Sequence, residues 1–405
     1  MPPGEEAIEK ATLLMRSFAE RTGLTSDRPK QRYLWTDAFA VCNFLGLARL
    51  TGERSYADLA LRLVDQVHHV LGRYRADDTR TGWISGLGER EGDSHPTCGG
   101  LRIGKALPER RPGEPFDQGL EWDRDGQYFH YLTKWMHALD QVSAATGDPR
   151  FNLWARELAE AAHAAFAGAG GGRAGRRMVW KMSTDLTRPL VASMGQHDPL
   201  DGLITCAQLE TTASLMSSAA QGPSLERAVA DFAAMIDGID LRTEDPLGLG
   251  GLLADAYRVA QLMTRGAFED GILLKSLLAV AQEGLVHYAQ HGDWQQPASQ
   301  RLAFRELGLA VGLAAIQRLQ KDTDDGRRRA FGSDELRARV HALGSHDGLR
   351  AAIVSAWLDP EHQRVRSWSE HRDINEVMLA TSLVTDGFLI IAARSNSPGS
   401  CSKSH

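Results

Sequence analysis

The chain has little cysteine, no excess of basic residues and no long apolar run. Only four of its 405 residues are cysteines, Cys42, Cys98, Cys206 and Cys401, and their unpaired spacing excludes a disulfide-stapled scaffold and suits a reducing compartment. The net charge of -6 argues against nucleic acid or anionic lipid as a partner. No apolar run approaches the ~18 residues of a membrane span. Because Met1–Glu6 lacks the basic and apolar segments of a secretory signal, we expect a cytoplasmic protein.

The alternating pattern of half-buried strands is almost absent, whereas apolar residues recur at helical spacing through most of the chain. One helical hairpin is repeated, since Thr51–Tyr56 is echoed by Thr146–Phe151 with matching apolar positions on both sides. Gly52 and Gly147 stand where the first helix of each copy needs a left-handed cap. Pro149 suits the first turn of the helix that follows. Repeated helical hairpins predict a solenoid or a closed toroid.

The periodicity predicts about twelve helices. Their expected ranges are 5–22, 33–50, 54–73, 125–145, 149–167, 200–219, 223–237, 249–265, 268–290, 301–320, 333–357 and 371–394. The first and last helices have no hairpin partner of their own, and the last is too apolar around Phe388–Ala393 to cap an open array. We therefore predict an all-α (α/α)6 toroid of six helical hairpins, a single domain over residues 1–394 in which the N-terminal helix pairs with the C-terminal inner helix. A disordered tail is expected over residues 395–405.

The second hairpin carries a resemblance to known enzymes. Its first helix contains Tyr131–Leu139, which reads YLTKWMHAL, and the chain continues to the turn at Ala145–Phe151. This sequence, together with the six hairpins, resembles the six-hairpin, glycosidase-like (α/α)6 toroid superfamily of carbohydrate-active enzymes. The resemblance is architectural, covers nearly the whole chain and matches no single family's catalytic signature. It implies an enzyme that acts on a saccharide.

The connections between the predicted helices differ in length. Turns from inner to outer helices are short, whereas the return connections, roughly 74–124, 168–199, 238–248, 291–300 and 358–370, are longer. In a toroid all returns lie on one rim, at the N-termini of the inner helices, and long loops in a compact domain usually serve function. Because this rim is rich in tryptophan, histidine and carboxylates, we predict that it holds the substrate pocket.

The leading hypothesis is a glycoside hydrolase that acts on a short or modified saccharide with paired carboxylates as acid and base. Asp123 or Asp125 is the expected general acid, and Asp37, Asp201 or Asp373 the expected base or nucleophile. His371, flanked by charged residues, is a further catalytic candidate. The residues expected to bind the sugar are aromatic platforms and neighbouring polar groups: Trp35, Trp122, Tyr128, His130, His197, Asp198, Trp294, Trp368, Glu370 and Arg372. No cofactor or metal is expected, and the oligomeric state is left open.

Two other functions stay open. A sugar epimerase or isomerase on the same toroid would transfer protons with histidines, for which His130, His197, His291 and His371 are candidates. Two imidazoles facing each other across the pocket, without a carboxylate pair, would favour this function. A non-enzymatic scaffold that binds a glycan or a protein would instead have a shallow or plugged central cavity and rim acids neutralised by internal arginines.

Several patterns also have structural explanations. Asp123, Asp198 and Asp373 suit helix caps, and Trp35 suits the core. Three further motifs are set aside, each for a missing group or an unsuitable position. Gly99–Ala106 nearly spells a phosphate-binding loop but ends in alanine where the metal-binding hydroxyl belongs, Asp322–Asp325 falls on the opposite rim, and His95–Cys98 lacks the further ligands of a zinc site.

Overall fold

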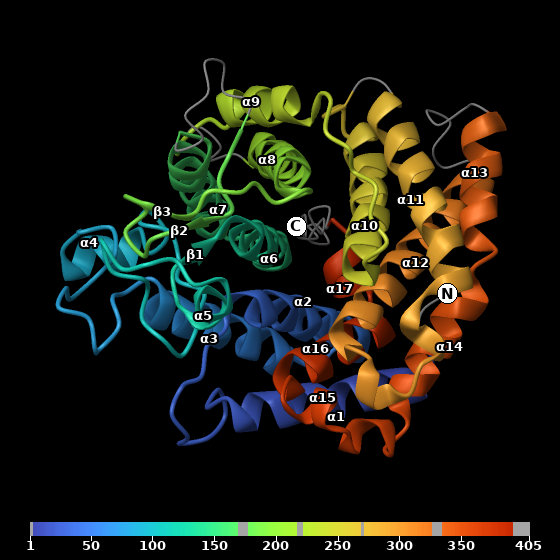
Figure 1. Cartoon of the computed structure of the whole chain (residues 1–405), viewed down its shortest axis with the longest axis horizontal. Coiled ribbons are helices and arrows are strands. Elements are labelled where there is room, and N and C mark those ends of the chain that lie inside the picture. Colours follow the sequence, from blue (N-terminus) through green and yellow to red (C-terminus); the bar gives the residue numbers. More distant parts are fainter. Residues whose placement is uncertain (1–2, 169–176, 217–221, 269–270, 326–333, 392–405) are drawn as a thin grey trace, which may run out of the picture.

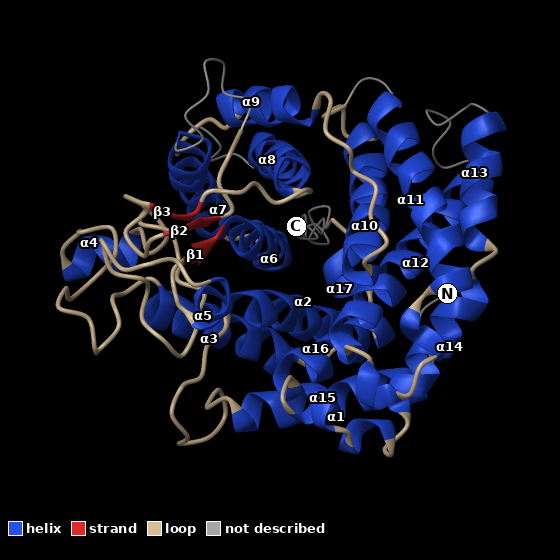
Figure 2. Ribbon diagram, in the orientation of Figure 1, coloured by secondary structure: helices blue, strands red, loops and turns tan. Residues whose placement is uncertain are grey.

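The structure is a computed structural model, and it describes residues 3–168, 177–216, 222–268, 271–325 and 334–391 (Figure 1). Helices make up most of the described chain, and strands are confined to three short segments (Figure 2). The tail predicted over 395–405 lies outside the described residues.

Six helices form an inner ring. They are α2 (Leu34–Thr51), α6 (Phe129–Thr146), α8 (Asp198–Ser214), α10 (Pro246–Met263), α12 (Ala303–Asp324) and α16 (Arg372–Leu383). Each packs against the next one along the chain, and α16 packs against α2, which closes the ring. Their position explains their composition, because in α2 every residue from Leu34 to Leu47 is buried. The fold is therefore an all-α (α/α)6 toroid.

Outer helices cover the ring. They are α3 (Arg54–Leu71), α7 (Pro149–Ala162), α9 (Glu226–Ile236), α11 (Ile272–His291), the pair α13 (Asp334–Gly344) and α14 (Asp347–Leu358), and α1 (Glu5–Arg21). Their amphipathic sequences suit this place, since α1 buries Ala11, Met15, Phe18 and Ala19 on one face. α1 packs against α16, so the two distant ends of the chain meet, which confirms the predicted pairing (Figure 1).

Local signals set the turns of the two repeated hairpins. Gly52 and Gly147, at the C-terminal ends of α2 and α6, both have φ of 74°. Glycine takes this left-handed conformation without steric cost. Pro149 occupies the first turn of α7. The two glycine caps and the proline position are therefore confirmed.

Two predicted helices are wrong in extent. The range 333–357 is divided into α13 and α14, with the break beside Gly344 and Ser345, which are weak helix formers. The range 371–394 ceases to be one helix at Leu383, after which the short helix α17 (Asp386–Leu389) follows. Beyond the break, side chains of other helices hydrogen-bond the carbonyl groups of this segment: Gln141 those of Gly387 and Ile390, and Gln261 that of Leu389.

The segment around α17 forms a floor across one end of the ring. It contacts α2, α6 and α10. Gln141 donates hydrogen bonds to the carbonyls of Gly387 and Ile390, at 2.8 and 2.7 Å. Phe388 stacks on Phe39 of α2 with ring centroids 4.4 Å apart. The apolar run that the sequence presents as the end of a helix thus closes the ring from inside.

The return connections carry the remaining elements. These are the short helices α4 (Glu89–Ser94), α5 (Gln118–Asp123) and α15 (Arg366–Ser369), a π-helical turn (His163–Ala167), the 3-10 turns Asp293–Gln295, Ala298–Gln300 and His362–Arg364, and the strands β1 (Gln127–Tyr128), β2 (Lys181–Met182) and β3 (Pro189–Val191). The strands form an antiparallel sheet in the order β1-β2-β3, which joins the first long return to the second (Figure 2). Among the described helices, none has the length and apolar character needed to cross a membrane.

Candidate active site

Two adjacent cavities lie at the rim where the inner helices begin. An inner cavity of about 280 Å³ lies within the ring and has Phe388 of α17 among its lining residues. An outer cavity of about 1310 Å³ lies beside it. The two meet at Trp35, His130, Trp180 and Leu247, which line both. The cavities are thus at the rim that the long return connections predict.

All six inner helices contribute to the inner cavity, and its polar groups come from three of them and the loops that precede them. These groups are His130 and Lys134 of α6, His197 before α8, Asp198 and Asp201 of α8, Asp245 before α10, and Asp255 and Arg258 of α10. On each helix the polar residues are three or four positions apart, so they share one face. The aromatic lining residues are Trp35, Phe39, Trp180 and Phe388.

His130 and Asp198 form an acid–base pair in this cavity. Nδ1 of His130 lies 3.9 Å from Oδ1 of Asp198. Burial lowers the pKa of His130 to about 4, so its imidazole is neutral at pH 7. Burial, followed by the charge of Asp201, raises the pKa of Asp198 to about 8. At neutral pH an uncharged imidazole, whose unprotonated nitrogen can accept a proton, therefore lies beside a protonated carboxyl group.

Aromatic packing fixes the ring of His130. Its plane is parallel to that of Trp180 within 1°, with centroids 6.3 Å apart, and it stacks on Tyr128 at 5.5 Å. Tyr131 meets it edge-on at 4.7 Å. These contacts orient the imidazole before any ligand binds, which reduces the entropic cost of placing a catalytic group.

Two ion pairs place cations in the same cavity. Nζ of Lys134 lies 2.8 Å from Oδ1 of Asp201, and Nη1 of Arg258 lies 3.1 Å from Oδ1 of Asp255. Burial opposes ionisation of Asp201, but the Lys134 ammonium outweighs it and holds the pKa of Asp201 below its ordinary value. Burial and the charge of Asp201 raise the pKa of Asp255 to about 6, with Arg258 opposing them. The cavity therefore holds both charge signs within reach of one ligand.

His197 supplies a second imidazole to the lining. Its Nε2 lies 2.9 Å from the carbonyl oxygen of Leu241. Because a carbonyl can only accept, Nε2 carries the proton in the neutral ring and Nδ1 is left as the basic atom. The site thus contains two histidines, one on α6 and one immediately before α8.

The acids of the outer cavity are largely neutralised by arginines. Asp37 is buried, accepts a hydrogen bond from the backbone N–H of Tyr33 at 2.9 Å and lies 3.6 Å from Arg32. Burial raises its pKa to about 6, with Arg32 opposing the shift. Arg21 of α1 lies 2.6 Å from Asp373. This neutralisation is one feature that the scaffold alternative predicts, whereas the inner cavity above Phe388 stays open.

The structure brings together many of the residues predicted from sequence. The inner cavity is lined by Trp35, His130, His197, Asp198 and Asp201. The outer cavity is lined by Trp35, Asp37, Trp122, His130, Glu370, His371, Arg372 and Asp373.

Five predicted residues line neither cavity: Asp123, Asp125, Tyr128, Trp294 and Trp368. Asp123 is exposed, whereas Asp125 is fully buried and receives hydrogen bonds from Arg102 at 2.5 Å and from the backbone N–H of Gly104 at 3.0 Å.

The three aromatic side chains of this group also have other contacts. Tyr128 stacks on the face of Trp180, with centroids 4.8 Å apart. Trp368 stacks on Trp357 at 5.8 Å, and Trp294 donates to the carbonyl of Ala289 at 3.4 Å. Their positions do not support contact with a substrate in either cavity.

Several lining residues were missed by the sequence analysis, among them Lys134, Trp180, Asp255 and Arg258. A signal existed for three of these four. Lys134 follows His130 by four positions and so shares its face of α6, and Asp255 and Arg258 interrupt the apolar sequence of α10. Trp180 lies in a connection between helices, so the helical periodicity of the sequence does not predict where its side chain lies.

No protein-family model matches this sequence, and no curated protein matches it. Three similar solved structures are described as D-mannose isomerase, a sugar epimerase from a ruminal bacterium, and cellobiose 2-epimerase from Spirochaeta thermophila. The first two share 10% identity with this chain at a TM-score of 0.48, and the match covers 94% of this chain and 98% of each of theirs. The third shares 11% identity at a TM-score of 0.46, covering 93% and 98%. At this level of likeness, no function passes from them to this chain.

Proposed function

We propose that this protein is a sugar isomerase or epimerase, which moves a proton on the carbon next to the carbonyl group of a small reducing sugar. The observation that carries the proposal is the pair formed by His130 and Asp198, 3.9 Å apart in the inner cavity. Proton transfer from carbon needs a neutral base and a proton donor at the same pH. The lowered pKa of His130 leaves a neutral base near pH 7, and the raised pKa of Asp198 leaves a proton donor at the same pH.

The groups near His130 and Asp198 in the inner cavity can take part in each step of such a reaction. His130 takes the proton from the carbon, and the electron pair of the C–H bond moves to the carbonyl oxygen to form an enediolate. Lys134 and Arg258 stabilise the negative charge that develops on oxygen. Return of the proton to the neighbouring carbon, while the hydroxyl proton of that neighbouring carbon passes to the former carbonyl oxygen, interconverts an aldose and a ketose. If His197 also carries a proton on Nδ1, its delivery to the opposite face of the carbon that was deprotonated inverts the configuration there, and His130 then gives its proton to solvent while His197 takes up another.

The size and walls of the inner cavity define the substrate class. Its volume of about 280 Å³ is close to the lower end, ~300 Å³, of ordinary ligand pockets. Its lining combines the indole rings of Trp35 and Trp180 with the charged and polar groups described above. This combination suits one sugar unit in its ring or open-chain form, and the larger outer cavity leaves room for a further unit.

A glycoside hydrolase is the second candidate, because Asp198 with its raised pKa has the protonation state of a general acid. Asp201 and Asp255 would then be the available base or nucleophile. Both are already held by cations, Lys134 and Arg258. Such pairing weakens a carboxylate as a nucleophile, and for this reason we place hydrolysis second.

One panel of substrates separates the candidates. The purified chain is incubated with reducing sugars and with aryl glycosides, and NMR follows sugar configuration and release of phenol. We expect conversion of a reducing sugar without phenol release, and a loss of about 10²-fold or more in kcat for His130→Asn. His287→Asn is the matched control, since this histidine lies outside both cavities. Phenol release by the wild type would favour the hydrolase, and absence of both reactions would favour the scaffold.

A further inference from the structure

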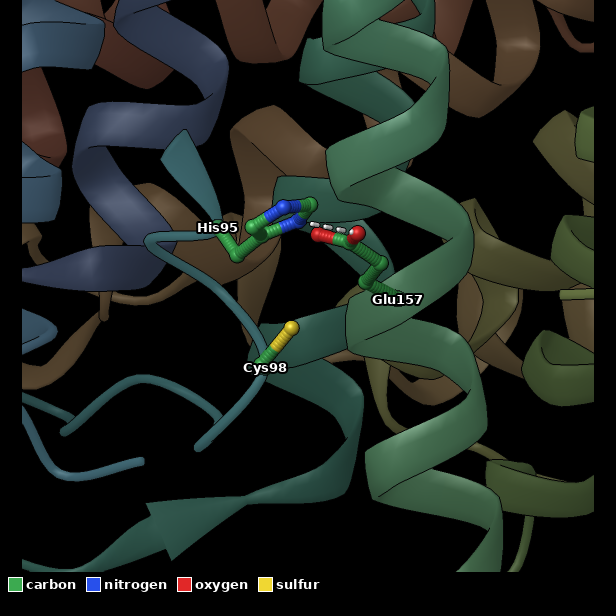
Figure 3. Close-up of side chains that lie close together, drawn as sticks. All are labelled: His95, Cys98 and Glu157. Atoms are coloured by element: carbon green, nitrogen blue, oxygen red, sulfur yellow. Dashed lines mark hydrogen bonds and ion pairs between the residues drawn. The ribbon is translucent and has the colours of Figure 1, made fainter. Parts of the chain in front are cut away.

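A second cluster of reactive side chains lies apart from both cavities. His95 and Cys98 belong to the long connection after α3, and Glu157 projects toward them from α7 (Figure 3). One ligand atom from each of the three residues lies within 4.8 Å of the others. Nδ1 of His95 is 2.6 Å from Oε1 of Glu157. The sequence shows only the first two residues as neighbours, and the fold supplies the third from 59 positions beyond Cys98 (157 − 98 = 59).

We propose that His95, Cys98 and Glu157 form a binding site for a divalent transition-metal ion of the zinc type, with water or Glu160 completing the coordination. Nitrogen, sulfur and carboxylate oxygen are the ligand atoms that zinc takes in proteins, at about 2.0–2.3 Å in a tetrahedron. Ligand atoms of such a tetrahedron are ~3.3–3.8 Å apart. The widest separation in the cluster, at most 4.8 Å, therefore needs to close by about 1 Å, and the 2.6 Å contact between His95 and Glu157 needs to open by about 0.7 Å; side-chain rotation can provide both changes.

The charges around the cluster favour a cation. Oε2 of Glu157 is buried and has no hydrogen-bond partner among the described residues. The negative charges of Glu157, Glu160 and Glu91 all act on the thiol of Cys98. A divalent ion would offset this negative charge and bind the thiolate directly. Binding releases the thiol proton of Cys98 to solvent, whereas neutral His95 binds through one ring nitrogen and keeps its proton on the other.

The position of the cluster indicates a structural role. It joins the long connection after α3 to helix α7, where Thr97 already donates a hydrogen bond to the carbonyl of Trp154 at 2.7 Å. The same connection supplies Arg102 and Lys105 to the outer cavity. A metal ion at the cluster would therefore hold this side of the rim against the second hairpin. Because 40% of the His95 side chain is exposed, an ion can enter from solvent.

Cobalt substitution tests the site directly. The full chain, freed of any affinity tag and stripped with chelator, is titrated with Co²⁺ and then with Zn²⁺. We expect one Co²⁺ per chain, a near-ultraviolet thiolate-to-cobalt charge-transfer band, and displacement of Co²⁺ by Zn²⁺. Cys98→Ser should abolish the band and weaken Zn²⁺ binding by more than ~100-fold, because loss of a ligand exceeds the ~10–100-fold cost of losing a supporting residue.

Matched variants keep the test decisive. His69→Ala removes an exposed histidine of the neighbouring helix α3, and Cys401→Ser removes a cysteine distant in sequence, so both should leave the band unchanged. Glu157→Gln should weaken Zn²⁺ binding while circular dichroism shows unchanged helicity. Failure of the wild type to bind either ion more tightly than Cys98→Ser would overturn the proposal. A band that persists in Cys98→Ser would do the same.

Discussion

Replacing Asp198 by Asn should change how the stability of the protein depends on pH. Asn has nearly the same size as Asp and keeps an acceptor oxygen, but it never ionises. In the folded protein the pKa of Asp198 is raised from its ordinary 3.8 to about 8, first by burial and then by the charge of Asp201. The folded state therefore binds a proton that the unfolded state loses at lower pH.

The sign and size of the effect follow from linkage. Below pH ~4 the carboxyl is protonated in both states and has no pH-dependent effect. Between about pH 4 and pH 8 the folded state keeps the proton on Asp198, whereas the unfolded state releases it. Raising the pH through this range therefore favours the unfolded state, and the wild type loses stability. Each pKa unit corresponds to ~1.4 kcal/mol, so the full loss is on the order of 5 kcal/mol by pH 8. The Asn variant escapes this loss.

Thermal unfolding of both proteins between pH 4.5 and 8.5 measures the effect. We expect the Tm of Asp198→Asn to approach that of the wild type at pH 4.5 and to exceed it by a growing margin toward pH 8. Asp240→Asn is the control, because this exposed carboxylate has its pKa lowered by its hydrogen bonds with Arg242 and should not reproduce the pattern. A Tm difference that is flat across this range would refute the assignment of a protonated Asp198.

Three further outcomes are expected. The rate of sugar conversion should rise with pH through about 4 as His130 loses its proton and fall through about 8 as Asp198 ionises, which a pH profile of kcat/KM will show. Lys134→Met should lower kcat by ~10²–10³-fold in steady-state assays, since it removes a cation from the developing negative charge. Gly387→Ala should lower the free energy of unfolding by ~1–3 kcal/mol or more in denaturant titrations, because its Cβ would lie 2.0 Å from a backbone oxygen of α2, whereas Gly348→Ala, with open space around it, should not.

The helical ring could be predicted because its signals are periodic and local. The caps at Gly52 and Gly147 and the helical spacing of apolar residues depend on the nearest few positions, and these are confirmed. The end of the last helix could not be predicted from such signals. There, Gln141 and Gln261 donate hydrogen bonds to backbone carbonyls of α17. Both lie on helices more than a hundred residues away, so no pattern in the neighbouring sequence indicates these bonds.

The position of the candidate site could be predicted from the sequence, but the roles of its individual residues could not. The rim follows from the asymmetry of the connections. The fold decides which acids of the rim face the cavity, because it supplies their partners. Asp125, for example, forms a buried ion pair with Arg102. Asp125 and Asp198 look equivalent in sequence, since each lies near the start of an inner helix. Only the three-dimensional contacts distinguish the structural carboxylate from the one that shares a cavity with His130.

The most direct test of the central claim is the fate of the hydrogen on the carbon next to the carbonyl group. A reducing sugar that the wild type converts is incubated with it in D₂O, and proton NMR follows that position in substrate and product. Proton transfer through His130 predicts that deuterium from solvent enters at this carbon with the wild type and does not enter with His130→Asn. If this carbon keeps its original hydrogen while aryl glycosides lose their phenol, the protein is a hydrolase and the proposed proton transfer is wrong.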